Sequence, residues 1–378
     1  MSSEKIFKTL HYSGVLSHNG DCTEMENGTS VTEFILARFP NVHEVEILLL
    51  VVFLLIYLVT VLGNTLIIVL VYTDGHLHSP MYYFLSYLSF REISMTSSVV
   101  PKMLANFLSE KKTISFDGCF SQLFFSFLMG TTEFILFAVM SYDGYVAVCN
   151  PLRYPSIMRS KVCSTLVLGC WAGAFVMILS SLVLAARLPY CGANVIDHYF
   201  CDSAPLLHLA CADIQLIEWI DFVVFWVLLL GSLALTVLSC AYIDSNIFWM
   251  PSAQGRQKAF ATCASHFTVV SLGFGISIFV YARPSHMTSV HLNKSLPVVS
   301  SIVAPLVNPF IFSLRKEQMK EALKNALHKG LVMTKRAGKP RASSWLVLSL
   351  EKSEQDLSVH RDKLASLDET PWMRFSGA

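Results

Sequence analysis

Two glutamates stand inside apolar stretches of the chain, where an ionisable side chain needs a partner. Glu92 lies near the middle of residues 81–104, and Glu133 lies midway along residues 119–148. Ionisable residues inside a membrane are rare and usually functional. If both carboxylates face one interior, either one of them is protonated or a cation such as sodium lies between them. The sequence leaves open the alternative that both are neutral and hydrogen-bonded.

Arg91 precedes Glu92 directly. Neighbouring residues on a helix do not face each other. We therefore expect Arg91 not to pair with Glu92, but to extend toward the membrane surface or to find another partner.

The elements that must hold these charges are membrane helices. The chain has 378 residues, of which 53% are hydrophobic and 15% are charged. In soluble proteins, about one quarter of the residues are charged. The net charge of +1 gives no electrostatic case for a nucleic-acid partner. Uncharged windows of about 20 residues or more can each cross a hydrocarbon core of about 30 Å. These windows are Ile47–Tyr72, Val162–Ala186, Phe222–Ile243, Ala259–Ala282 and Ser295–Leu314. With residues 81–104 and 119–148, seven spans are predicted.

The seven spans divide the chain into four parts. We expect an extracellular N-terminal segment at 1–45, irregular and mostly flexible, and a seven-span domain at 46–315. An amphipathic helix on the membrane surface is expected at 316–329, since basic and apolar residues alternate there at helical spacing. Residues 330–378, rich in Ser, Lys and Glu, are expected to be a disordered cytoplasmic tail.

Charge and a sequon predict the orientation. Lys and Arg gather after the third, fifth and seventh spans, which places the N-terminus outside and the C-terminus in the cytoplasm. The glycosylation sequon Asn27-Gly28-Thr29 agrees with this orientation. The chain is thus expected to be a multi-pass protein of the plasma membrane.

Four cysteines then lie around the outer end of the third span and in the following outer loop, where disulfides persist. They are Cys119, Cys191, Cys201 and Cys211. Four cysteines allow three pairings, and spacing does not choose among them.

Several segments, in order and spacing, carry a family resemblance. They are Gly63-Asn64, LHSPMY at 77–82, VPKML at 100–104, MSYDGYVAVCNPL at 140–152, SAQGRQKAF at 252–260, TCASH at 262–266, Asn308-Pro309 and SLR at 313–315. The chain resembles an olfactory (odorant) receptor, within the rhodopsin-like G-protein-coupled receptors, over about residues 27–327. The resemblance implies an all-α fold, a seven-transmembrane helix bundle with a short amphipathic eighth helix.

The resemblance also implies a function without a cofactor. Its partners would be a small volatile odorant, a heterotrimeric stimulatory G protein that raises cyclic AMP, and membrane lipid. The implied disulfides are Cys119–Cys201 and Cys191–Cys211. The implied ligand pocket contains Phe127, Gly130, Thr131, Trp226, Leu230, Phe274, Ser277 and Tyr281, a set that suits a small apolar ligand. The implied coupling and switch residues are Asp143, Gly144, Tyr145, Tyr242, Asn308, Pro309 and Phe312.

Two of these positions depart from the family pattern. Gly144 stands where relatives have the arginine of an Asp-Arg-Tyr motif, and Phe312 stands where they have a tyrosine. Without that arginine, the charge of Asp143 must be solvated or met by Arg153 or another nearby cation. Glu92 replaces an aspartate and keeps the charge.

Three functions follow from these features. The first is an odorant receptor that signals, and the second is a receptor that binds ligand but signals poorly. The third is a transporter or proton channel that uses Glu92, Glu133 and Asp143, although no paired repeat is visible. No metal-ligand cluster, nucleophile motif or phosphate loop favours an enzyme.

Overall fold

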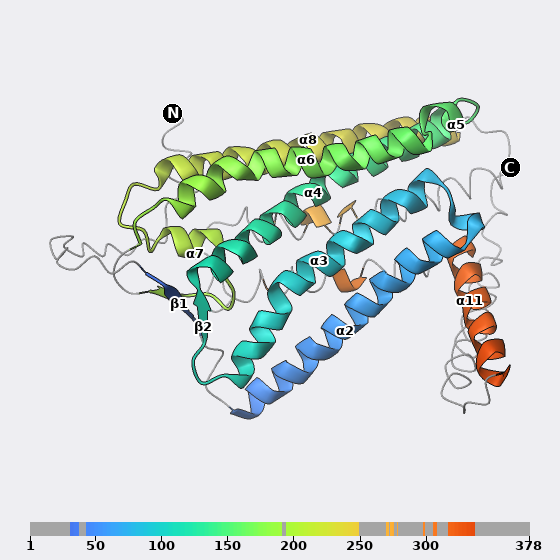
Figure 1. Ribbon diagram of the computed structural model, residues 1–378. Coiled ribbons are helices and arrows are strands. Elements are labelled where there is room, and N and C mark those ends of the chain that lie inside the picture. The colour runs from blue at the N-terminus through green and yellow to red at the C-terminus, as the bar shows by residue number, and fades with distance from the viewer. Residues whose placement is uncertain are drawn as a thin grey trace, which may run out of the picture. The chain divides into compact units, whose positions relative to one another are not determined.

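The computed structural model describes residues 31–37, 43–190, 194–248 and 317–336, with 270–271, 273–275, 278, 298 and 305–307. Long helices dominate these ranges (Figure 1). They are α2 (His43–Thr73), α3 (Pro80–Leu108), α4 (Phe116–Cys149), α6 (Ser160–Ala186), α8 (Gln215–Phe248) and α11 (Glu317–Arg336). Short helices connect some of them: η1 (Gly75–Leu77), α5 (Tyr154–Ile157) and α7 (Ser203–Leu207).

Five of the predicted spans lie on these helices. Among the described residues, four helical stretches are long and apolar enough to cross a membrane: Val45–Thr73, Phe116–Cys149, Ser160–Ala186 and Gln215–Asn246. Helix α3 has a comparable length but carries Arg91 and Glu92 near its middle. The predicted spans at 259–282 and 295–314 lie largely outside the described residues.

Helix α4 lies at the centre of the described bundle. It packs against α3, α6 and α8, while α2 packs against α3 (Figure 1). Many large apolar side chains of α2, such as Leu48, Leu55 and Leu62, are exposed. Exposure of such a face suits a helix whose solvent is lipid rather than water.

A small sheet covers one end of the bundle. Strands β1 (Glu33–Leu36), β2 (Thr113–Ser115) and β3 (Val195–Ile196) pair in the order β2-β1-β3. The β1–β2 pair is antiparallel and the β1–β3 pair is parallel. Alternate residues of β1, Phe34 and Leu36, are buried. The expectation of an irregular segment at 1–45 was therefore wrong for β1, where a period-2 apolar pattern meets two other strands.

Helix α2 begins at His43, before the predicted boundary at 46. Its first residues include the charged Glu44 and Glu46, which lie before the uncharged window that starts at Ile47. The Glu46 carboxylate accepts a hydrogen bond from the Lys112 ammonium at 2.6 Å, beside β2. This ion pair holds the start of α2 to the loop that precedes the third span.

Helix α11 belongs to a separate unit, residues 318–378, and is described by itself. It continues past the expected end at 329 to Arg336. Met319 and Ala322, one turn apart, are buried, while Gln318, Glu321 and Lys324 are exposed. Such one-sided burial fits an amphipathic helix.

Candidate functional site

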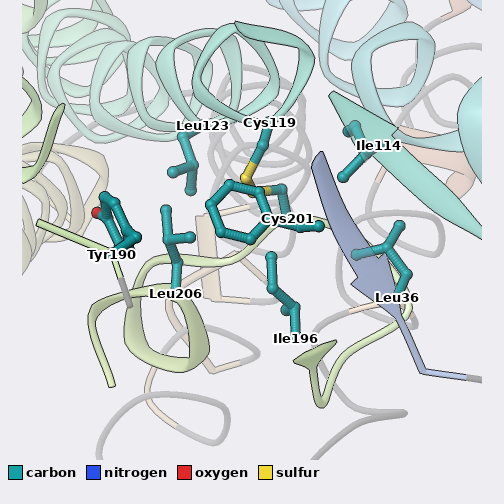
Figure 2. Close-up of a cluster of buried hydrophobic side chains, with 9 residues drawn as sticks. Leu36, Ile114, Cys119, Leu123, Tyr190, Ile196, Cys201 and Leu206 are labelled. Atoms are coloured by element: carbon teal, nitrogen blue, oxygen red, sulfur yellow. A yellow bond between two sulfur atoms is a disulfide. The ribbon is translucent and has the colours of Figure 1, made fainter. Parts of the chain in front are cut away.

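The site begins with the disulfide at the sheet-covered end of the bundle. Cys119 in the first turns of α4 is bonded to Cys201, with a Cα–Cα distance of 5.4 Å. The bonded pair lies in a buried apolar cluster (Figure 2). That cluster contains Phe34, Leu36, Ile114, Cys119, Leu123, Tyr190, Ile196, Cys201 and Leu206. We call this end of α4 the disulfide end.

The bridge is the pairing that the family resemblance implied. Gln122, about one turn further along α4, adds a second link to the same loop residue. Its Oε1 accepts a hydrogen bond from the Cys201 backbone N–H at 2.9 Å. Cys211 is also disulfide-bonded. Its expected partner, Cys191, lies outside the described residues.

Further along α4, aromatic side chains join three parts of the chain. Phe274 is buried, and its ring centroid lies 5.7 Å from that of Phe134 and 6.0 Å from that of Phe137. Phe134 also meets Phe225 of α8 at 6.4 Å, and Phe225 contacts Trp226 at 5.6 Å. The candidate pocket residues Trp226 and Phe274 are therefore linked through one aromatic cluster.

The other candidate pocket residues lie in different surroundings. Phe127 packs at the margin of the disulfide cluster, and Thr131 is buried. Gly130 has open space beside it, because an added Cβ would meet no atom within 4 Å outside the local helix. Leu230 is 54% exposed, whereas its neighbour Leu229 is 1% exposed. Ser277 and Tyr281 lie outside the described residues.

Ser126 is a further residue on this part of α4 that the sequence did not single out. Its hydroxyl oxygen is buried and has no hydrogen-bond partner in the described part of the chain. A buried polar atom normally has a partner. A serine in a helix usually finds one in the carbonyl four residues earlier, so the available hydroxyl of Ser126 is visible only in the folded structure.

Further along α4, three charged side chains meet inside the bundle. The Arg91 guanidinium lies 2.7 Å from a Glu92 oxygen and 2.5 Å from a Glu133 oxygen. Its Nε also donates to the Met129 carbonyl at 3.1 Å. The expectation that Arg91 does not pair with Glu92 was wrong, whereas the alternative that Arg91 finds another partner is confirmed by Glu133. The long, flexible stem of arginine lets its head bend back to an adjacent carboxylate, although the two Cβ atoms point apart.

At the opposite end of α4, the Asp143 carboxylate is buried, with 3% of the residue exposed. It accepts a hydrogen bond from the Tyr154 hydroxyl of α5 at 2.9 Å. Burial, together with the Asp143 charge, raises the pKa of Tyr154 above its ordinary value. Two of the three expected surroundings of Asp143 are therefore wrong, since the carboxylate is shielded from water and Arg153 is exposed. The third, another nearby cation, stays a prediction. We call this the Asp143 end.

The neighbours of Asp143 are held against α8. The rings of Tyr145 and Tyr242 lie 5.7 Å apart. Gly144 is half-buried, and an added Cβ would meet only the Ile243 side chain at 3.8 Å, an ordinary contact. Larger side chains can therefore start from this position without a clash at Cβ. The other candidate switch residues, Asn308, Pro309 and Phe312, lie outside the described residues, as does Asn27.

Comparison with known proteins decides the family. A family model described as "Olfactory receptor" matches residues 53–330. The chain belongs to the olfactory receptor family. Among curated relatives, human olfactory receptor 6S1 is 49% identical over 299 residues, which are 79% of this chain and 90% of that protein. Human olfactory receptor 6Y1 is 46% identical over 305 residues, which are 81% of this chain and 94% of that protein.

Membership confirms the predicted fold class. This olfactory receptor is an all-α, seven-transmembrane bundle and a multi-pass membrane protein. The described helices α2, α3, α4, α6 and α8 are the first five spans of that bundle. The disulfide end and the Asp143 end therefore lie at opposite ends of the third transmembrane helix.

Proposed function

We propose that this receptor binds small volatile odorants and acts on a heterotrimeric stimulatory G protein, whose activation raises cyclic AMP. The observation that carries the proposal is the family match over most of the chain. The disulfide end would face the outside, and the Asp143 end would face the cytoplasm, in agreement with the distribution of Lys and Arg along the sequence.

The odorant would bind between α4, α8 and the segment around Phe274. Apolar and aromatic side chains suit a volatile ligand, and the open space beside Gly130 gives it room. The buried hydroxyls of Ser126 and Thr131 can bond its one or two polar atoms. We include Phe127, Trp226, Ser277 and Tyr281 in this pocket. Leu230 is the weakest member of the set because its side chain is exposed.

Signalling would be weak in the natural chain because of Gly144. A cation after the aspartate is what the family uses at this position, and glycine offers neither charge nor reach. Phe312 lacks the hydroxyl of the tyrosine that it replaces. We therefore favour a receptor that binds odorant and couples poorly.

An odorant panel on cells that carry the chain tests both halves of the proposal. We expect Gly144→Arg to raise odorant-evoked cyclic AMP by about 5-fold or more over the natural chain, the lower end of ordinary allosteric coupling. Gly144→Ala is the control, since it removes the conformational freedom of glycine without adding charge or reach. Surface expression must be equal among the three chains. Equal and robust cyclic AMP from the natural chain and Gly144→Arg would contradict poor coupling.

The same cells distinguish a receptor from a transporter. A receptor raises cyclic AMP only when ligand is present. A transporter or proton channel that used Glu92, Glu133 and Asp143 would move ions without odorant, and such a current would overturn the proposal.

A further inference from the structure

The carboxylates of Glu92 and Glu133 share one partner, and that partner is part of the chain. Glu92 is 0% exposed at its side chain, Arg91 is 5% exposed and Glu133 is 13% exposed. One guanidinium nitrogen lies against each carboxylate. The third, Nε, donates to the Met129 carbonyl. All three nitrogens of the arginine head are thus engaged inside the bundle.

The geometry of the two helices makes this arrangement specific. Met129 and Glu133 are four residues apart on α4, so the carbonyl of one and the side chain of the other lie on the same side of that helix. Arg91 approaches from α3, which packs against α4. The planar guanidinium presents its donors in a fixed fork and stays charged at any pH a protein tolerates. A sodium ion would have to coordinate these oxygens from the place that the guanidinium occupies.

We propose that Arg91 is the resident cation of the Glu92–Glu133 site, and that this receptor therefore takes no sodium ion there. A sodium ion would have to displace a tethered group or lie beside a like charge in a buried place, where charges interact strongly. The guanidinium also cancels half of the negative charge that would otherwise attract a metal cation. The site expected from the sequence to hold a free cation is filled by the chain itself.

The unmodified receptor provides the first test. The full-length protein is purified in detergent, and its thermal unfolding midpoint is measured in sodium chloride and in choline chloride at equal ionic strength. We expect the same midpoint in both salts. A higher midpoint in sodium, saturable with concentration, would overturn the proposal without any variant.

Removal of the guanidinium provides the second test. Arg91→Leu leaves two buried carboxylates without their internal cation, so we expect a midpoint lower by several degrees in choline and a saturable rise with sodium. Glu133→Gln added to Arg91→Leu should abolish that rise. The exposed Arg187 supplies the control, since Arg187→Leu should change neither midpoint.

Arg91 variants that fold decide between the alternatives. A folded Arg91→Leu receptor whose midpoint ignores sodium would contradict the proposal. If Arg91→Leu does not fold, Arg91→Gln replaces it, because glutamine keeps a polar stem but carries no charge. Arg91→Lys should remain insensitive to sodium, since it retains a tethered cation.

Discussion

At the Asp143 end of α4, the buried carboxylate of Asp143 has the phenol of Tyr154 as a hydrogen-bond partner. The Tyr154 hydroxyl donates to the carboxylate across the gap between α4 and α5. Because burial and the Asp143 charge raise the pKa of Tyr154, the phenol keeps its proton throughout the neutral range and remains a donor. The residue after the aspartate can therefore be glycine without leaving Asp143 unsatisfied.

Tyr154→Phe tests this contact. The change removes the donor and leaves a buried carboxylate short of one hydrogen bond, which should lower the free energy of unfolding by about 1.5–3 kcal/mol. Denaturation of the purified receptor measures the loss. Tyr142→Phe is the control, since Tyr142 is an exposed tyrosine of α4, next to Asp143 in sequence. Equal stability of the two variants would show that the hydrogen bond contributes little.

Among the elements, β1 has a role beyond its length of four residues. It lies between β2 and β3 and so connects the N-terminal segment with two loops of the disulfide end. Phe34 inserts between aromatic rings, 5.9 Å from Phe116 and 5.7 Å from Tyr190. A short central strand of this kind is stabilised by the side chains on its buried face as well as by its backbone hydrogen bonds.

Phe34→Ala should therefore destabilise the disulfide end by about 3–5 kcal/mol, the usual cost of removing a fully buried aromatic ring. Ile35→Ala is a matched control on the opposite face of β1, where the side chain is 39% exposed. Surface expression and thermal stability report the difference. Similar losses in the two variants would mean that β1 does not depend on its buried face.

For the molecule as a whole, the Cys119–Cys201 bridge joins segments that are 82 residues apart in sequence. It fixes the loop that carries β3 and α7 to the start of the central helix α4. Closing so long a loop restricts the unfolded chain, and loss of a native disulfide costs about 2–5 kcal/mol. The bridge is thus expected to decide whether the bundle reaches the cell surface.

Cys119→Ser and Cys201→Ser should each abolish surface expression, measured by antibody labelling of intact cells. Cys240→Ser is the control, because Cys240 is a free, partly exposed cysteine of α8. Normal surface levels of either bridge variant would refute this role. The double variant should be no worse than each single one, since both remove the same bond.

Composition and local pattern by themselves determined the membrane class, the first five spans and the family. These features depend on apolar run length and on motifs whose residues are close in sequence, so no knowledge of long-range contacts is needed. The ends of the helices and the short strands were predicted less well from the sequence. Helix α2 starts earlier than expected, and β1 forms where an irregular segment was predicted. A strand of four residues becomes stable only when its partners, far away in sequence, are in place.

The tertiary structure alone decided which charges meet. From the spacing of the sequence, Arg91 was expected to face away from Glu92, and Asp143 was expected to be solvated or met by Arg153 or another nearby cation. In the fold, the flexible stem of Arg91 reaches both Glu92 and Glu133, and Tyr154 reaches Asp143. Side-chain reach and helix packing set these contacts, because a buried charge adopts whichever conformation gives it a partner.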